Sequence, residues 1–378
     1  MGEATFFRRW MTIIAIRLGV MLVAFLIGCA PPEPIRIGFV GGTSGRVADL
    51  GIAGRNGAQL AVELRNQAGG VAGRAVELLI RDNEQNPDMA ERVTRDLIAQ
   101  GVVAIIGPMT SAMAMRMVPI ANQAQLVLLS PGATTNALSG QDDYFFRVIS
   151  ATRQFARKNA LYQRNIQHLQ RISVAYDLGN KAYTESWLGD FRDAFTGDGG
   201  EIVKTLSFVS GSDTAFLQIA RDLLADPVDG VVIVANSMDA ALLCQQIRKL
   251  DSRIPIAVSE WGATERLMEL GGKAVEGVMT AQFFDRNSTA PAYQTFYQAY
   301  RDRFGQEPGF SGVAGFDAAN VVLDALAQRQ SGQSLKQTLL AIRRFAGVQN
   351  PVIFDDFGDA KRDTFITVVR GGQFVVAE

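Results

Sequence analysis

The sequence predicts an α/β fold of two lobes, each a doubly wound, mostly parallel sheet flanked by helices. After residue 34, segments typical of strands and of helices alternate with little interruption, and helices between strands favour right-handed parallel crossovers. Several of the strands are apolar at every position, which is typical of strands buried on both faces. The chain has 378 residues, and this length is sufficient for two domains of ordinary size.

The elements of the first half follow from apolar periodicity and from capping residues. Ile35–Val40 is rich in β-branched residues and ends in a Gly-rich turn. Gly54–Gln67 is amphipathic and stops at Gly69-Gly70, a pair typical of a helix C-terminus. Asn86-Pro87 opens the next helix, because proline is favoured in the first turn. The other strands expected in this half are Val76–Ile80, Val102–Ile106 and Leu126–Leu129.

The same alternation continues in the second half and again indicates parallel strands. The expected strands are Ile172–Tyr176, Val228–Val234, Ile254–Val258 and Val275–Thr280. The expected helices are Tyr183–Phe195, Thr214–Leu224, Asp239–Leu250, Ala292–Phe304 and Val313–Gln330. Short strands are expected at Pro351–Phe354, Phe365–Val369 and Phe374–Val376.

Two sheets imply two lobes with crossings between them. Polar or Gly-containing stretches near residues 146–151, 280–284 and 353–358 separate stronger elements and are the candidate crossings. We therefore expect an N-terminal lobe of residues 35–148 plus 283–354, and a C-terminal lobe of residues 149–282 plus 355–378.

An apolar run near the N-terminus predicts export from the cytoplasm. Leu18–Ile27 spans roughly ten residues, whereas a membrane-spanning helix needs about 20. Three arginines precede the run, which is the layout of a secretory signal peptide. We therefore expect residues 1–28 to be removed, whether translation starts at Met1 or at Met11.

The end of that run, Leu26-Ile27-Gly28-Cys29, resembles the bacterial lipobox, in which the cysteine is lipidated and becomes the first residue of the mature protein. The resemblance implies lipidation at Cys29. A stiff, extended tether over residues 29–34 would follow, because this segment is rich in proline. The alternative is a structural cysteine in a buried helix. No later apolar stretch is expected to be long enough to cross a bilayer. The protein would thus be attached through Cys29 alone, on the periplasmic or cell-surface side of an inner or outer bacterial membrane.

Composition argues against several classes of function. The chain has 37 Lys and Arg against 38 Asp and Glu, a balance that gives no sign of a nucleic-acid partner. His168 is the only histidine, which argues against a Ser-His-Asp triad, a Cys-His pair or a multi-histidine metal site. With Cys29 lipidated, Cys244 has no disulfide partner, and its apolar helical surroundings predict a buried small hydrophobe.

Two neighbouring strands of the first half end in residues suited to a ligand. Val102–Ile106 is followed by Thr110-Ser111, which should cap the next helix, and a helix start suits a carboxylate. Leu126–Leu129 is followed by Ser130–Thr135, where a Gly-Ala pair lets a ligand approach the backbone and a threonine offers a hydroxyl. Ligands in open α/β sheets bind beyond the carboxyl ends of the strands. For each segment alone an ordinary cap or turn is the more frequent explanation, and the two together are the better indication of a site.

An ordered series of segments resembles the periplasmic branched-chain amino-acid-binding proteins, the type I substrate-binding subunits of ABC importers. The resemblance covers nearly everything after Pro34. The segments that carry it are Ser44-Gly45, Gly69–Arg74, Asp82, Asn86-Pro87, Ile106-Gly107, Ser111, Ser130–Thr134, Phe146-Arg147, Asp177, Tyr183, Glu260 and Gly315–Ala319. It implies two Rossmann-like lobes with parallel-type sheets flanked by helices and joined by three hinge crossings, the type I periplasmic binding protein fold.

The resemblance also implies the roles of individual residues. In that family the α-carboxylate of the ligand is held by a hydroxyl that matches Ser111 and by the segment that matches Gly132, Ala133 and Thr134. The α-ammonium is held at the Thr134 position and by an acid that matches Glu260. The physical reading agrees, because Glu260 follows a predicted strand and a buried ammonium group needs a carboxylate. From the residues alone, a solvated loop acid is the alternative for Glu260.

Three further positions are implied around the ligand. Tyr183 matches a tyrosine that covers the ligand after the lobes close, although from sequence alone it is equally an ordinary aromatic. Leu50 and Asn236 match positions that line the pocket for the ligand's side chain, where relatives often carry aromatic residues. Because this chain departs from its relatives there, the side-chain specificity stays open.

The expected function is therefore that of an extracytoplasmic solute-binding lipoprotein. It would capture an amino acid, branched-chain or similar aliphatic, by hinge closure and deliver it to ABC permease subunits. We expect a monomer without catalytic residues, metal, cofactor or nucleic acid. The alternatives are a lipoprotein of the same fold that activates another protein, and a sensor of amides or other small molecules. An enzyme is least supported, since the sequence has no G-x-S-x-G, Walker A or G-x-G-x-x-G motif.

Overall fold

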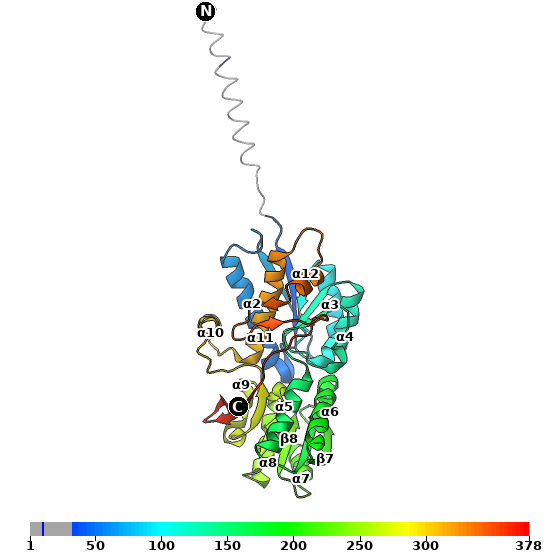
Figure 1. Cartoon of the computed structure of the whole chain (residues 1–378), viewed down its shortest axis with the longest axis vertical. Coiled ribbons are helices and arrows are strands. Elements are labelled where there is room, and N and C mark those ends of the chain that lie inside the picture. Colours follow the sequence, from blue (N-terminus) through cyan, green and yellow to red (C-terminus); the bar gives the residue numbers. More distant parts are fainter. Residues whose placement is uncertain (1–9, 11–31, 378) are drawn as a thin grey trace, which may run out of the picture.

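Two sheets, one in each half of an elongated molecule, organise the chain (Figure 1). The structure is a computed structural model that describes residue 10 and residues 32–377, so the expected signal peptide and Cys29 lie outside the described residues. We call the half with the first sheet the N-terminal lobe and the other half the C-terminal lobe. Blue, cyan and orange segments form the upper lobe in Figure 1, and green and yellow segments form the lower one. The predicted two-lobed α/β fold is confirmed.

The sheet of the N-terminal lobe has the strand order β2-β1-β3-β4-β5, with parallel neighbours throughout. Its short central strands are buried at every position, as expected for a sheet covered on both faces. The strands are β1 (Ile35–Gly41), β2 (Val76–Asp82), β3 (Ala104–Ile106), β4 (Val127–Ser130) and β5 (Phe145–Arg147). The helices of this lobe are α2 (Ala48–Gln67), α3 (Pro87–Ala99), α4 (Ser111–Gln123), α10 (Pro291–Phe304), α11 (Gly309–Gln328) and α12 (Leu335–Ile342). A separate two-stranded ladder joins β11 (Arg344–Phe345) to β12 (Val352–Ile353).

The sheet of the C-terminal lobe has the order β14-β13-β10-β9-β8-β6-β7. It is parallel from β7 to β10, and the last two strands of the chain add antiparallel to its edge. The strands are β6 (Arg171–Asp177), β7 (Glu201–Phe208), β8 (Gly230–Val234), β9 (Ile256–Val258), β10 (Met279–Gln282), β13 (Phe365–Arg370) and β14 (Gln373–Val376). The helices are α5 (Thr152–Asn165), α6 (Lys181–Gly197), α7 (Phe216–Leu223), α8 (Ser237–Leu250) and α9 (Glu265–Gly271).

Two capping expectations have different outcomes. Asn86 caps α3 as predicted, since its side-chain oxygen accepts hydrogen bonds from the backbone N–H groups of Asp88 and Met89. Thr110 occupies the N-cap position of α4, but its side chain makes no capping hydrogen bond. Its hydroxyl instead donates to Gln85 Oε1 at 3.1 Å. The first turn of α4 therefore keeps backbone donors that its own N-cap side chain does not use.

Several boundaries differ from the expectation. α2 begins at Ala48, two turns before the predicted start at Gly54, because the apolar face continues through Leu50. The strand expected at Val275–Thr280 is displaced toward the C-terminus, since Gly272–Val275 forms a 3-10 turn. The sequence did not predict β5, α5, β7, α9, β11 and α12.

Glycines bring α2 and α11 into backbone contact. A Cβ atom on Gly57 would lie 2.1 Å from the carbonyl oxygen of Gly312, and one on Gly315 would lie 2.1 Å from that of Gly54. Any side chain at these positions would push the helices apart. The close approach also lets the Ser311 hydroxyl donate to the backbone oxygen of Leu50 at 2.6 Å.

The same helix corrects an expectation about membrane spans. Within residue 10 and residues 32–377, α11 is the one helix whose length and apolar composition would suffice to cross a bilayer, and 72% of its most apolar window is buried in the protein. The expectation that no later stretch reaches this length is therefore wrong. The burial of α11 agrees with a core helix, because it packs on α2 and the first sheet.

The chain passes between the two lobes after β5, after β10 and after β12. The first and third crossings lie side by side, since the backbone N–H of Arg147 donates to the carbonyl oxygen of Gly358 at 3.1 Å. In the same region the backbone N–H of Arg362 donates to the Ser150 hydroxyl at 2.8 Å. The buried guanidinium of Arg362 also pairs with Asp317 of α11 at 2.8 Å. The residues at which each lobe begins and ends stay predictions.

Candidate ligand-binding site

The candidate site begins where β3 and β4 end. The two loops lie against each other: a Cβ atom on Gly132 would lie 2.3 Å from the carbonyl oxygen of Met109, so only glycine fits. Ser130 Oγ accepts hydrogen bonds from the backbone N–H groups of Gly132 and Ala133, at 3.2 and 2.8 Å. The same hydroxyl donates to the carbonyl oxygen of Pro108 at 2.7 Å. These contacts hold the predicted Gly-Ala segment as a fixed backbone platform.

Ser111, the first residue of α4, lies behind this platform. Its Oγ accepts hydrogen bonds from the backbone N–H groups of Thr134 and Thr135, both at 3.2 Å. The hydroxyl of Thr134 is buried and has no hydrogen-bond partner within the part of the chain that the structure describes. A buried hydroxyl without a partner is costly. The platform thus carries one polar atom that the described residues leave unsatisfied.

Glu260 faces the platform from the C-terminal lobe, in the 3-10 turn that follows β9. The residue is 6% exposed, so the alternative of a solvated loop acid does not hold. Its Oε2 accepts a hydrogen bond from Trp187 Nε1 at 2.9 Å, whereas Oε1 has no partner among the described residues. Burial raises the pKa of Glu260 to about 8, because it disfavours the charged form.

Tyr183 lies beside this acid, in the first turns of α6. It is buried, and its ring packs edge-on against Trp261 with 5.6 Å between ring centroids. Among the described residues its hydroxyl has no partner within full hydrogen-bond geometry, although Ser259 and Glu260 lie near enough to influence its ionisation. Burial, and then the neighbouring Glu260 carboxyl, raise the pKa of Tyr183 well above its usual value, so the hydroxyl remains a donor at neutral pH.

A small cavity of about 20 Å³ lies between these groups. The structure brings five of the predicted site residues to it, and they come from both lobes: Leu50, Gly132, Thr134, Tyr183 and Glu260. Five further lining residues were not predicted: Met109, Ile149, Asn180, Trp261 and Phe310. Trp261 could have been found from sequence, because it directly follows Glu260. Phe310 carried no local signal, because only the packing of α11 on α2 brings it to Leu50.

Three predicted residues do not line the cavity. Ser111 and Ala133 belong to the platform behind it, through the hydrogen bonds given above. Asn236 caps α8, and its side-chain nitrogen donates to Asp239 Oδ2 at 2.8 Å and to Ser210 Oγ at 3.2 Å. Its predicted role in a side-chain pocket therefore has no support from the cavity lining.

Polar contacts join the two lobes around the cavity. Asp49, in the first turn of α2, accepts hydrogen bonds on Oδ2 from the hydroxyls of Ser237 and Thr264, at 2.6 and 2.5 Å. Arg46 forms an ion pair with the buried Asp239. These contacts cross from one lobe to the other without lining the cavity, so they stabilise the closed arrangement independently of it.

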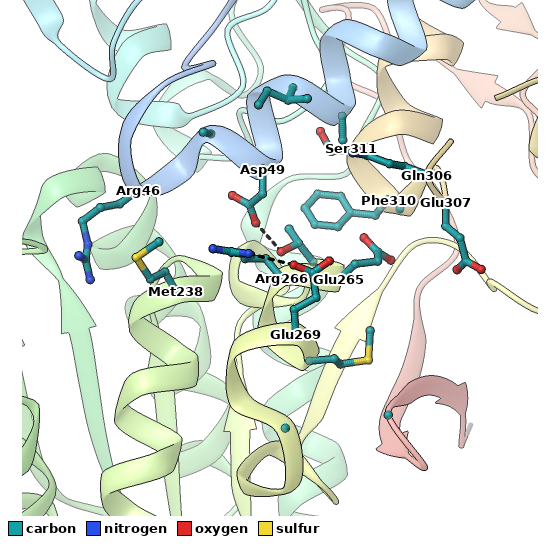
Figure 2. A pocket seen from close by; sticks show the side chains of 18 of the residues that line it. Arg46, Asp49, Met238, Glu265, Arg266, Glu269, Gln306, Glu307, Phe310 and Ser311 are labelled. Atoms are coloured by element: carbon teal, nitrogen blue, oxygen red, sulfur yellow. Dashed lines mark hydrogen bonds and ion pairs between the residues drawn. The ribbon is translucent and has the colours of Figure 1, made fainter. Parts of the chain in front are cut away.

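A larger groove of about 1130 Å³ opens beside the cavity, between the start of α2 and α9. Figure 2 shows charged side chains of both signs around it, with Arg46 and Asp49 from the N-terminal lobe and Arg266 and Glu269 from the C-terminal lobe. None of the described residues that line the groove has a buried polar side-chain atom without a partner. The groove therefore has no unpaired buried polar atom that a ligand would satisfy, whereas the small cavity has such atoms.

The remaining chemical expectations concern Cys244 and His168. Cys244 is a free, fully buried thiol in an apolar cluster of the C-terminal lobe, as predicted, and burial raises its pKa to about 12. His168 is exposed, in a loop before β6. Over residue 10 and residues 32–377, no group of three or more His, Cys, Asp or Glu side chains is arranged to hold a metal ion.

Comparisons with known proteins agree with this geometry. The family model described as "Periplasmic binding protein" matches residues 34–373. A relative named "Leu/Ile/Val-binding protein homolog 7" from Brucella melitensis is 24% identical over 351 residues, which cover 87% of each chain.

Solved structures of solute-binding proteins have a similar fold. The substrate-binding protein LivJ from Streptococcus pneumoniae, in complex with isoleucine, has a TM-score of 0.83 and 26% identity, with 90% of this chain and 98% of that chain covered. A solute-binding protein from R. palustris, in complex with benzoate, has a TM-score of 0.82 and 20% identity, over 91% and 96% of the two chains. The latter likeness concerns the fold alone.

These matches confirm the resemblance found in the sequence. Such proteins bind solutes for ABC transporters and are not enzymes, and the family name implies a location outside the cytoplasm. The match covers both lobes and the residues around the cavity. The chain belongs to the periplasmic binding protein family.

Proposed function

We propose that this protein captures an α-amino acid with an aliphatic side chain, of the branched-chain type, and delivers it to an ABC importer. The single observation that supports this most strongly is a set of unpartnered buried atoms at one cavity. Thr134 Oγ1 and the Tyr183 hydroxyl are available donors, and Glu260 Oε1 is an available acceptor. A zwitterion presents the complementary groups, a carboxylate and an ammonium.

The carboxylate of the ligand would bind on the N-terminal lobe. The buried Thr134 hydroxyl is a donor there that the described residues leave unpaired. The Ser111 hydroxyl lies behind it, and its two accepted hydrogen bonds leave its own proton free to donate. The start of α4 also lies at this point, and the positive end of its dipole favours an anion.

The ammonium group would bind between Thr134 and Glu260. An ammonium beside Glu260 favours the charged carboxylate, which burial alone disfavours. Benzoate, the ligand of one structural neighbour, has no cationic group and would leave Glu260 unpaired. An amino acid therefore fits the cavity better than an aromatic acid.

Apart from Asn180, the remaining side chains around the cavity are mainly apolar. Leu50, Met109, Ile149 and Phe310 contribute its aliphatic and aromatic surface, and burial of apolar surface stabilises an aliphatic side chain by about 25 cal/mol per Å². The name of the Brucella relative and the isoleucine bound to the S. pneumoniae protein support the same class of ligand.

The ligand would bind by opening and closing of the lobes. A cavity of about 20 Å³ holds about one water molecule, so an amino acid needs the lobes to separate before it enters. Closure on the ligand then excludes water and strengthens the charge pairs. The three crossings between the lobes would act as the hinge, and the permease would select the closed form.

The lipid anchor completes the proposal. Export and lipidation at Cys29 would tether the binding protein to a bacterial membrane, outside the cytoplasm. The apolar run and the Cys29 motif support this step. Mass spectrometry of the protein expressed in a bacterium tests it: a mature chain that begins with a diacylated Cys29 is expected, and an intact residue 1–28 segment would contradict it.

A ligand screen tests the function. We expect isothermal titration calorimetry to give micromolar or tighter binding for L-leucine, L-isoleucine or L-valine and none for benzoate. Melting curves with the twenty amino acids and with small amides serve as a wider screen. If no small molecule binds, the proposal is wrong, and a protein-interaction lipoprotein of the same fold is favoured. If only an amide binds, the sensor alternative is favoured.

A further inference from the structure

A buried indole lies directly behind the acid of the cavity. Trp187 is 0% exposed and does not line the cavity, yet its Nε1–H donates to Glu260 Oε2 at 2.9 Å. It lies one helical turn after Tyr183 in α6, and residues four apart lie on the same face of a helix. The same helix face therefore brings two side chains to Glu260, one beside the cavity and one behind it.

The hydrogen bond makes the two oxygens of Glu260 unequal. Oε2 accepts the hydrogen bond from the indole, whereas Oε1 has no partner among the described residues. Glu260 is also one of the residues that line the cavity. A carboxylate that rotated freely could turn either oxygen, or neither, toward a ligand. With Oε2 fixed from behind, Oε1 is left for the cavity.

The indole itself is held in place. Trp187 stacks on Phe191 with 5.0 Å between ring centroids and 12° between ring planes, and Phe191 stacks on Phe195 at 5.5 Å and 14°. All three side chains are fully buried. An aromatic stack of this kind leaves the indole few alternative rotamers, so the N–H direction is set by the core of the C-terminal lobe.

We propose that Trp187 is a positioning residue for ligand recognition: its indole N–H fixes Glu260 so that the free oxygen receives the ammonium group of the ligand. This inference rests on the proposed function in its last step, the binding of an amino acid. Its first step, the control of Glu260 by the indole, does not depend on the identity of the ligand.

The hydrogen bond also favours the charged form of the acid. A donor to a carboxylate stabilises the ionised state, and Trp187 is one of the groups that oppose the effect of burial on Glu260. Tyr183, from α6, is the titratable side chain beside Glu260 and also favours its charged form. Among the described residues, no lysine or arginine shifts the pKa of Glu260. Loss of the indole N–H should therefore raise the pKa of Glu260 further.

The test uses Trp187→Phe, which keeps an aromatic ring in the stack and removes the donor. Phe191→Leu is the matched control, because it disturbs the same stack and keeps the N–H. For both variants and the wild type, carbon-13 NMR follows the ionisation of Glu260 without ligand. Calorimetry then follows L-leucine binding from pH 6 to pH 9.

We expect Trp187→Phe to raise the pKa of Glu260 and to weaken L-leucine binding at pH 7 by about tenfold or more. Part of the lost affinity should return as the pH rises, because the acid then ionises. Phe191→Leu should keep the wild-type pKa and the wild-type pH profile. If Trp187→Phe matches the wild type in both measurements, the proposal is wrong.

Two further outcomes separate this inference from the proposed function. If the wild type does not bind L-leucine but the pKa of Glu260 still rises in Trp187→Phe, the role of the indole is supported and the leucine ligand is wrong. Should Trp187→Phe fail to fold, nitrogen-15 NMR of the wild type decides. The Trp187 Nε1–H resonance should move with the titration of Glu260, and an unmoved resonance would contradict the proposal.

Discussion

Glu260 is the residue on which recognition depends most. It is a buried acid with one satisfied and one unsatisfied oxygen, placed opposite a platform of donors from the other lobe. Alone, such a group favours the neutral form, and beside an ammonium it favours the charged form. The same carboxyl can therefore be tolerated in the ligand-free protein and bind tightly to a cation.

Removal of this acid should abolish most of the affinity. We expect Glu260→Ala to weaken binding of L-leucine by roughly 3–5 kcal/mol, because the ammonium would be buried without a partner. Calorimetry measures the change. Glu269→Ala is the control, since Glu269 is an exposed acid of the neighbouring groove, and its removal should leave the affinity unchanged. An unchanged affinity in Glu260→Ala would remove Glu260 from the site.

The raised pKa also predicts how stability depends on pH without ligand. The pKa of Glu260 is about 8 in the folded protein and near 4.5 when the acid is unperturbed. The stabilising contribution of the bound proton is thus fully present below about pH 4.5 and is lost as the pH rises through 8. The melting temperature of the wild type should fall relative to that of Glu260→Gln between pH 5 and pH 8. A constant difference between the two proteins would show that Glu260 is not buried as described.

Among the secondary-structure elements, the loop after β4 has the strictest geometry. A Cβ atom on Gly132 would lie 2.3 Å from the Met109 carbonyl oxygen, and backbone cannot yield as a flexible side chain can. Gly132→Ala should therefore displace the platform, lower stability by about 1–3 kcal/mol and weaken L-leucine binding.

The control for this substitution lies in a helix. A Cβ atom on Gly189, in α6, would have no neighbouring atom within 4 Å, so Gly189→Ala should be neutral or stabilising by up to about 1 kcal/mol. Thermal unfolding and calorimetry of both variants make the comparison. Equal affinities in the two variants would show that the platform is not part of the site.

Two of the elements that the sequence missed are very short, since β5 has three residues and β11 has two, and a third, α5, buries polar side chains. In α5, the buried face contains Asn159 and Gln163, so apolar spacing alone underestimates it. These two amides bond to each other at 2.6 Å, and Asn159 donates to the backbone of Val258 at 3.2 Å. Polar residues of this kind become compatible with burial only when tertiary partners are known.

The part of the candidate site that lies at strand ends was predictable from the sequence. Gly132, Thr134 and Glu260 lie at strand ends, where chain order and the resemblance locate them. Phe310 and Asn180 reach the cavity only through packing between elements far apart in the chain. Asn236 also follows a strand, but its side chain caps α8 and does not line the cavity, so its role at the ligand stays a prediction.

For the molecule as a whole, the contacts between the lobes set the balance between open and closed forms. Asp49 accepts two hydroxyl hydrogen bonds from the opposite lobe without lining the cavity. Asp49→Ala should favour the open form and reduce the apparent affinity for L-leucine by about tenfold, because fewer molecules are in the binding-competent state.

Small-angle X-ray scattering of the ligand-free protein checks this directly. The radius of gyration of Asp49→Ala should exceed that of the wild type, and saturating L-leucine should bring the two values together. The control is Asp142→Ala, which removes an exposed acid paired with Lys336 within the N-terminal lobe. If Asp49→Ala has the wild-type radius and affinity, the interlobe contacts do not control closure.

The recognition of both ends of one small molecule by opposite lobes is tested most directly by a crystal structure with L-leucine bound. We expect the amino group within hydrogen-bond distance of Glu260 Oε1 and the carboxylate within hydrogen-bond distance of the Thr134 and Ser111 hydroxyls. A structure in which the leucine lies outside the cavity, or in which Glu260 points to solvent while leucine is bound, would contradict this account.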